Sequence, residues 1–183
     1  MNPPKAILVI GAGDATGGAI ARRFAREGYI ACVTRRSDYK LQPLVEQIRA
    51  EGGQAHAFGS DARKEEEMVA LVEKIEREIA PIEVAVFNIG ANVRFSITET
   101  TARVYFKVWE MACFAGFLMG REVTKAMLPR GRGIQERVVT VSGSTILIFQ
   151  GSAHERRPNC CPIVLGVELV MQSSPYVFYS NGS

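Results

Sequence analysis

The sequence predicts an α/β fold, a doubly wound parallel sheet with helices on both faces. Between residues 5 and 142, short apolar runs alternate with longer stretches whose apolar residues recur at helical spacing. This alternation is typical of βαβ units, in which each crossover helix returns the chain so that the next strand runs parallel. A chain of 183 residues is long enough for one domain with a sizeable core. We therefore expect one domain over residues 1–142 and an atypical tail over residues 143–183.

The expected strands and helices follow one another in strict order. The strands are short runs rich in branched apolar residues, and the helices have one apolar face. Gly28 and Pro129 are expected to end the first and the last helix. The expected strands are 6–10, 30–34, 54–61, 83–90 and 137–142, and the expected helices are 18–28, 39–53, 64–81 and 101–127.

The alternation stops after the fifth strand. From Gly133 onward the chain contains no Asp and no Lys, and no stretch has a clean helical face. Residues 161–172 fit a buried strand or a short helix, and periodicity does not decide between them. We therefore expect a sheet that is incomplete after strand five. A truncation, a frameshift or an alternative end of the reading frame is our hypothesis for this change.

Composition and charge argue against several classes of function. The net charge of +3 has no long basic run behind it, which argues against nucleic-acid and membrane-surface binding. The apolar run near the N-terminus is too short for a signal peptide or a membrane span, so a cytoplasmic protein is expected. The four cysteines have no CxxC spacing, and no metal site is expected.

Glycines lie between the first expected strand and the first expected helix. Backbone without a Cβ atom can approach a pyrophosphate closely, and the N–H groups at the start of a helix favour negative charge. Gly11, Gly13 and Gly17 would supply the turn and the close approach. This context predicts a Rossmann-like dinucleotide site, and the alternative is a merely tight turn between strand and helix.

Two arginines, Arg35 and Arg36, follow directly on the second expected strand. In a Rossmann geometry the residue at this strand end faces the adenosine ribose, where a carboxylate selects NAD and an arginine meets a 2′-phosphate. Each guanidinium can hold a phosphate with two hydrogen bonds. NADP is therefore the expected cofactor and NAD the less favoured one. The alternative is two solvated arginines.

The glycine segment resembles the cofactor loop of the short-chain dehydrogenase/reductase family, written TGxxxGxG. Gly11 and Gly17 match the pattern, Ile10 stands at its threonine, and Ala15 replaces its middle glycine. The resemblance covers roughly residues 5–142, and it identifies the chain as a truncated or divergent member at its C-terminal end.

Two further segments resemble family motifs in the same order. The sequence GSDAR resembles the family's segment after strand three, and FNIGA resembles its NNAG motif. The resemblance implies that Asp61 binds the adenine amino group with Ala62 beside it. It also implies that Asn88 and Gly90 lie near the adenosine ribose.

The resemblance implies hydride transfer between a nicotinamide and a small carbonyl or alcohol substrate. In the family, a serine after strand five holds the substrate oxygen and an asparagine in the long fourth helix positions a lysine. Ser144 and Ser142 flank Gly143, which stands at the usual serine position, and Ser144 is slightly preferred. An alternative role for both hydroxyls is to satisfy backbone groups at the strand end. Ala112 stands at the position of the family's asparagine.

The family's reacting tyrosine has a lysine four residues on, which helps to lower the pKa of the phenol. No tyrosine of this chain has a lysine at that spacing. Tyr176 and Tyr179 are therefore interpreted as packing or edge residues.

Three functions remain open at this point. The first is an NADP-dependent oxidoreductase whose activity is impaired, and the second is a non-catalytic dinucleotide-binding or interaction protein with the same fold. A serine hydrolase that uses Ser142 or Ser144 with His154 is the third, although no G-x-S-x-G pattern surrounds either serine. A homo-oligomer is possible, but the family's usual interface helix is missing.

Overall fold

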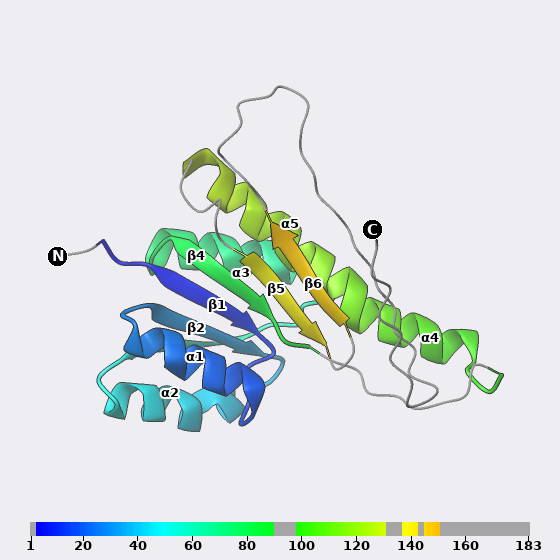
Figure 1. Cartoon of the computed structure of the whole chain (residues 1–183), viewed down its shortest axis with the longest axis horizontal. Helices are drawn as coiled ribbons and strands as arrows, with labels where there is room; N and C mark the ends of the chain where they lie inside the picture. Colours follow the sequence, from blue (N-terminus) through cyan, green and yellow to red (C-terminus); the bar gives the residue numbers. More distant parts are fainter. Residues whose placement is uncertain (1–2, 90–97, 131–136, 143–144, 151–183) are drawn as a thin grey trace, which may run out of the picture.

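A computed structural model describes residues 3–89, 98–130, 137–142 and 145–150. Within these residues one sheet has the strand order β3-β2-β1-β4-β5-β6 (Figure 1). The first five strands run parallel, and β6 pairs antiparallel with β5. The strands are β1 (Ala6–Ile10), β2 (Ile30–Arg35), β3 (Gln54–Gly59), β4 (Ile82–Phe87), β5 (Arg137–Ser142) and β6 (Thr145–Gln150).

Helices cover both faces of the sheet, with α1 and α2 on one face and α3 and α5 on the other (Figure 1). A π-helical turn, η2, joins α4 to α5, so that the three form one helical run. The helices are α1 (Thr16–Arg26), α2 (Gln42–Ala50), α3 (Glu65–Glu78), α4 (Ala102–Trp109), η2 (Glu110–Phe114) and α5 (Ala115–Met127), with the short 3-10 turns η1 (Asp38–Leu41) and η3 (Leu128–Arg130). Of the described helices, none is both long and apolar enough to cross a membrane.

The central strand β1 is buried on both faces. Ile7 and Val9 pack toward α1 and α2, whereas Leu8 and Ile10 pack toward α3 and α5. Because successive side chains of a strand point to opposite faces, a continuous apolar run is what a strand between two helical layers requires. The run Ala6–Ile10 therefore specifies the centre of the sheet rather than an edge.

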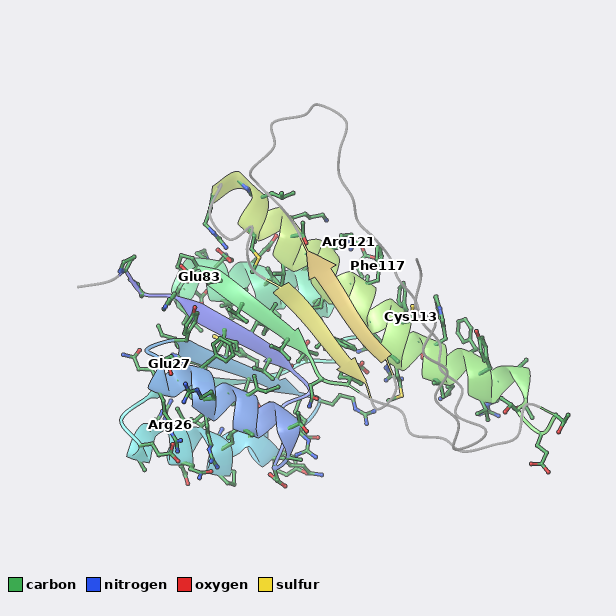
Figure 2. All side chains as sticks on the ribbon, viewed as in Figure 1. Arg26, Glu27, Glu83, Cys113, Phe117 and Arg121 are labelled. Carbon is green, nitrogen blue, oxygen red and sulfur yellow. The ribbon has the colours of Figure 1, made fainter. Side chains whose placement is uncertain are left out.

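One salt bridge joins α3 to α5, and further polar contacts lie within α5. The Arg121 guanidinium on α5 lies 2.7 Å from the Glu65 carboxylate at the start of α3. Glu122 is buried, and its carboxylate accepts hydrogen bonds from Arg121 at 2.6 Å and Lys125 at 2.9 Å. Figure 2 labels Phe117 and Arg121 on α5, and the Arg121 guanidinium lies 5.6 Å from the centre of the Phe117 ring. The ion pair supplements the apolar core that α3 and α5 share, and this packing positions η2 at the start of α5.

The strand order places a topological switch point beside β1. The chain leaves β1 for β2 on one side and returns to β4 on the other. In open α/β sheets, ligands bind at such a point, outside the carboxyl ends of the strands. Ile10 pairs with Thr34 of β2 and with Phe87 of β4, so the residues that follow these three positions meet at one edge.

The predicted doubly wound fold is confirmed, including all five expected strands and the four expected helical segments. Gly28 adopts φ +82° just after α1 and ends that helix, as predicted. Two details differ from expectation. The helix expected over 101–127 contains the π-helical turn η2, and the strand β6 was not expected at all.

Strand β6 has a simple origin in the sequence. Residues 145–150 read TILIFQ, an apolar and largely branched run that begins three residues after the end of β5. A connection this short can join only antiparallel neighbours. The sequence pattern does not predict this strand, because the alternation of strand and helix stops after β5. The undecided segment 161–172 lies outside the described residues.

Candidate functional site

The loop after β1 is pinned to the end of β2. Gly11 has φ +82°, a conformation that glycine adopts without strain. The N–H groups of Gly11 and Ala12 donate to the Thr34 carbonyl oxygen at 3.1 and 3.0 Å. A Cβ atom on Gly11 would lie 2.6 Å from the Asn88 carbonyl oxygen, and the Asn88 side-chain amide donates to the Gly11 carbonyl oxygen at 3.1 Å. Strands β1, β2 and β4 therefore hold this loop jointly.

The first turn of α1 packs tightly against the same loop. A Cβ atom on Gly17 would lie 2.8 Å from the Gly11 carbonyl oxygen, and one on Gly18 would lie 2.1 Å from the Gly13 carbonyl oxygen. Both contacts are closer than a real Cβ atom tolerates, so both glycines are required for packing. Gly13 is different, because the nearest atom to its added Cβ is an Arg35 side-chain nitrogen 4.0 Å away.

The residue before α1 supplies no side-chain cap to the start of this helix. The residue before the helix is Ala15, which has no side-chain acceptor, and the first turn contains no acidic residue. The first N–H groups of a helix have no partner within the helix, and they carry partial positive charge. An anion such as a pyrophosphate fits this place.

A cleft of about 160 Å³ lies at the carboxyl ends of β1, β2 and β3. It brings together five of the residues predicted from the sequence, namely Gly11, Arg35, Arg36, Asp61 and Ala62. The other residues that line it are Ile10, Thr34, Ser60, Arg63, Ile89 and Met111.

A larger hollow of about 440 Å³ lies beside strand β3, and Gln42, His56 and Lys74 are among its lining residues. It contains none of the residues predicted to bind a dinucleotide, and it lies away from the switch point. The smaller cleft is therefore the better candidate site.

Arg35 and Arg36 bring positive charge to this cleft. Arg35 is half-buried at the end of β2 and Arg36 is exposed. Neither guanidinium forms a salt bridge with a carboxylate of the described residues, so both are available to an anionic ligand. The charge of Arg36 also contributes to lowering the pKa of Asp61.

Asp61 is held by Arg63. The Arg63 Nε donates to Asp61 Oδ1 at 2.9 Å, and a terminal nitrogen of the same guanidinium donates to Oδ2 at 2.5 Å. This hydrogen-bonded pair lowers the pKa of Asp61 from an ordinary value of 3.8 to about 2. The Asp61 N–H in turn donates to the Glu67 carboxylate at 2.7 Å. Asp61 is therefore a fixed, ionised acceptor at neutral pH.

The ion pair of Asp61 predicts a pH dependence of stability. A carboxyl group whose pKa is lower in the folded state stabilises the fold fully above its unfolded pKa of 3.8, and this contribution is lost as the pH falls toward 2. We expect the free energy of unfolding to fall more steeply between about pH 5 and about pH 2.5 in the wild type than in Asp61→Asn. Urea unfolding at several pH values measures both slopes, and equal slopes would contradict the prediction.

The π-helical turn borders the cleft. Met111 of this turn lines the cleft, and the Glu110 carboxylate lies 3.7 Å from the Arg63 guanidinium. Ala112, which stands at the position of the family's asparagine, lies within the turn. Such turns inside α-helices occur frequently at functional sites.

Several site residues were missed by reasoning from the sequence. Gly18, Ser60 and Arg63 each stand one or two positions from a predicted site residue, and Met111 stands beside Ala112. The doubled glycine at 17 and 18 was the available signal for Gly18. No pattern in the sequence indicates the paired hydrogen bonds between the Arg63 guanidinium and the Asp61 carboxylate.

The remaining predicted site residues cannot be placed in the cleft. Gly90 and Ser144 lie outside the described residues, as do His154, Tyr176 and Tyr179. Ser142 ends β5 and pairs with Thr145 of β6. Among the described residues, no group of three or more His, Cys, Asp or Glu side chains could hold a metal ion.

Comparison with known proteins identifies relatives of the chain. The short chain dehydrogenase family matches residues 5–151. A short chain dehydrogenase of Pseudocercospora fijiensis is 30% identical over 142 residues, which cover 75% of this chain and 44% of that protein. The 2,3-dihydro-2,3-dihydroxybenzoate dehydrogenase of Bacillus subtilis is 31% identical over 145 residues, covering 76% and 52%. The chain thus spans about half the length of these curated relatives.

Solved structures agree with the family match. A short-chain dehydrogenase from Rhodopseudomonas palustris is 50% identical with a TM-score of 0.67, and the match covers 70% of this chain and 60% of that one. A variant of actinorhodin polyketide ketoreductase with NADPH is 30% identical with a TM-score of 0.67, covering 71% and 51%. With the glycine loop, the cleft and these matches together, the chain belongs to the short-chain dehydrogenase family, whose members are oxidoreductases that bind a nicotinamide dinucleotide.

Proposed function

We propose that this chain binds NADP and serves hydride transfer between the nicotinamide and a small carbonyl or alcohol substrate. The observation that carries the proposal is the pair Arg35 and Arg36, two guanidiniums without a salt bridge among the described residues, beside the uncapped start of α1. A related ketoreductase structure that contains NADPH supports the same cofactor.

Each part of the cleft has a role in this proposal. The loop from Gly11 to Gly17 and the first turn of α1 bind the pyrophosphate, since their backbone is free of side chains and offers N–H donors. Arg35 and Arg36 bind the 2′-phosphate by charge-assisted hydrogen bonds. Asp61 accepts from the adenine amino group with Ala62 beside it, and Asn88 and Gly90 lie near the adenosine ribose.

The reacting end is assigned by resemblance. When bound, the nicotinamide supplies or accepts the hydride. Ser144, or Ser142, holds the substrate oxygen. In this proposal residues 1–142 form the cofactor domain and residues 143–183 replace the region that carries the tyrosine and lysine in the family. A cytoplasmic location belongs to the same proposal.

A second candidate is a protein that binds the dinucleotide without turning over a substrate. Ala112 favours this alternative, because a methyl group cannot position a lysine as the family's asparagine does. Under this alternative the chain senses or sequesters cofactor, or acts through an interaction surface.

Binding and turnover separate the two candidates. The purified chain is titrated into NADPH while the nicotinamide fluorescence is recorded, and NADPH oxidation is then followed at the absorbance of the reduced ring with a panel of carbonyl compounds. Enhanced fluorescence with oxidation supports the oxidoreductase. Enhanced fluorescence without oxidation of any compound supports the binding protein and overturns the oxidoreductase for this chain. No enhancement overturns both.

A further inference from the structure

Arg63 occupies most of the acceptor positions of the Asp61 carboxylate. Oδ1 of Asp61 accepts from Arg63 Nε at 2.9 Å and from the Arg63 backbone N–H at 3.2 Å, and Oδ2 accepts from a terminal guanidinium nitrogen at 2.5 Å. A carboxylate offers about four acceptor positions, two on each oxygen. Among the described residues, only Arg63 donates to this carboxylate and it takes three positions, so one position on Oδ2 is left for a ligand.

Further contacts restrict the rotation of this pair. The Asp61 backbone N–H donates to Glu67 at 2.7 Å, which fixes the main chain at this residue. The far side of the Arg63 guanidinium lies 3.7 Å from the Glu110 carboxylate. The side chains of Asp61 and Arg63 are 17% and 28% exposed, so water competes only in part for these contacts. Both residues line the cleft.

This remaining acceptor position on Oδ2 favours a hydrogen-bond donor over an acceptor. An exocyclic amino group offers an N–H donor to it, whereas a carbonyl oxygen placed there would face a negative charge. Adenine carries its amino group on C6 of the purine ring. Hypoxanthine carries a carbonyl oxygen on the same carbon and an N–H on the adjacent ring nitrogen. A carboxylate free to turn could accept from that ring N–H instead. The Asp61 carboxylate, which Arg63 holds through both of its oxygens, cannot turn to accept from that ring N–H.

We propose that Arg63 is a positioning residue that holds Asp61 in the orientation that accepts from an amino group, so that the cleft distinguishes adenine from hypoxanthine. The inference rests on the proposed function, since it concerns the base of the same dinucleotide. Arg63 acts through Asp61 and has no assigned contact with the cofactor.

The test compares NADPH with its analogue that carries hypoxanthine in place of adenine. Dissociation constants are measured from nicotinamide fluorescence for the wild type, Arg63→Ala and Arg63→Lys. We expect the wild type to bind NADPH about tenfold more tightly than the analogue, as one charge-assisted hydrogen bond implies. In Arg63→Ala the ratio is expected to fall to within about twofold, because Asp61 can then turn. Lysine lacks the planar fork, so Arg63→Lys is expected to give an intermediate ratio.

Arg77→Ala is the matched control, since Arg77 is an exposed arginine that pairs with its neighbour Glu78 away from the cleft. Its ratio is expected to equal that of the wild type. A wild-type ratio in Arg63→Ala would overturn the role of Arg63 while leaving NADPH binding intact. If thermal unfolding shows that Arg63→Ala does not fold, a wild-type ratio in Arg63→Lys overturns the role instead. Failure of the wild-type chain to bind NADPH would overturn the proposed function, and this inference with it.

Discussion

Replacing Gly18 by alanine is expected to lower the free energy of unfolding by about 3 kcal/mol. Within a helix this replacement ordinarily stabilises, by up to about 1 kcal/mol. Here the new Cβ atom would lie 2.1 Å from the Gly13 carbonyl oxygen, and a backbone oxygen cannot move without opening the loop. The cost of this steric clash therefore exceeds the gain in helix propensity, so the replacement is expected to destabilise the protein. Urea unfolding gives the change as a lower midpoint at an unchanged slope.

Gly13→Ala is the matched control for this prediction. It lies in the same loop and has no positive φ, and among the described residues its added Cβ would meet only an Arg35 side-chain nitrogen at 4.0 Å. We expect a stability close to that of the wild type. Equal stability of the Gly18→Ala variant and the wild type would show that the loop can open without cost.

The double replacement Arg35→Ala/Arg36→Ala is expected to weaken NADPH binding by about 100-fold or more. A hydrogen bond to a charged group contributes about 1.5–3 kcal/mol, and two such groups are removed from the 2′-phosphate. NADH has no phosphate at this place, so its dissociation constant is expected to stay near the wild-type value. Fluorescence titration with both dinucleotides measures the change in preference.

A second double variant separates specific binding from the loss of two positive charges. Arg23→Ala/Arg77→Ala removes the same charge at exposed sites that pair with Glu27 and Glu78. It is expected to bind NADPH as the wild type does. An equal loss of NADH and NADPH affinity in Arg35→Ala/Arg36→Ala would contradict the assignment of these arginines to the 2′-phosphate.

The sequence predicted those parts of the molecule that depend on local pattern. The apolar run Ala6–Ile10 predicts a central strand because only a two-sided layer accepts five buried side chains in succession. Gly11 and Gly17 could be found because a turn and a close approach require glycine at these places. Arg35 follows from its place at the end of the second strand, which faces the adenosine ribose in a Rossmann geometry. Asp61 and Ala62 were predicted from the resemblance of the segment GSDAR to the family's motif.

What the sequence could not predict depends on contacts between side chains or on a break in the pattern. The fork between Arg63 and Asp61 is set by rotamers, which spacing does not encode. The π-helical turn at Glu110–Phe114 has one more residue per hydrogen-bonded turn than the α-helix around it. No proline or glycine within this turn indicates it in the sequence. Strand β6 begins three residues after the end of β5, as in a β-hairpin, whereas the βαβ pattern of the preceding chain predicts a helix at this position.

The hydrogen bond from the Asn88 side chain to the Gly11 carbonyl oxygen joins residues 77 positions apart. A ribosome that adds about 5–20 residues per second needs about 4–15 s to synthesise the chain between them. During that interval the glycine loop is complete in sequence but has no β4 to close it. Under the proposed function, the cofactor therefore meets a complete loop only after β4 has docked, so its binding stabilises a sheet that has already formed and does not nucleate folding.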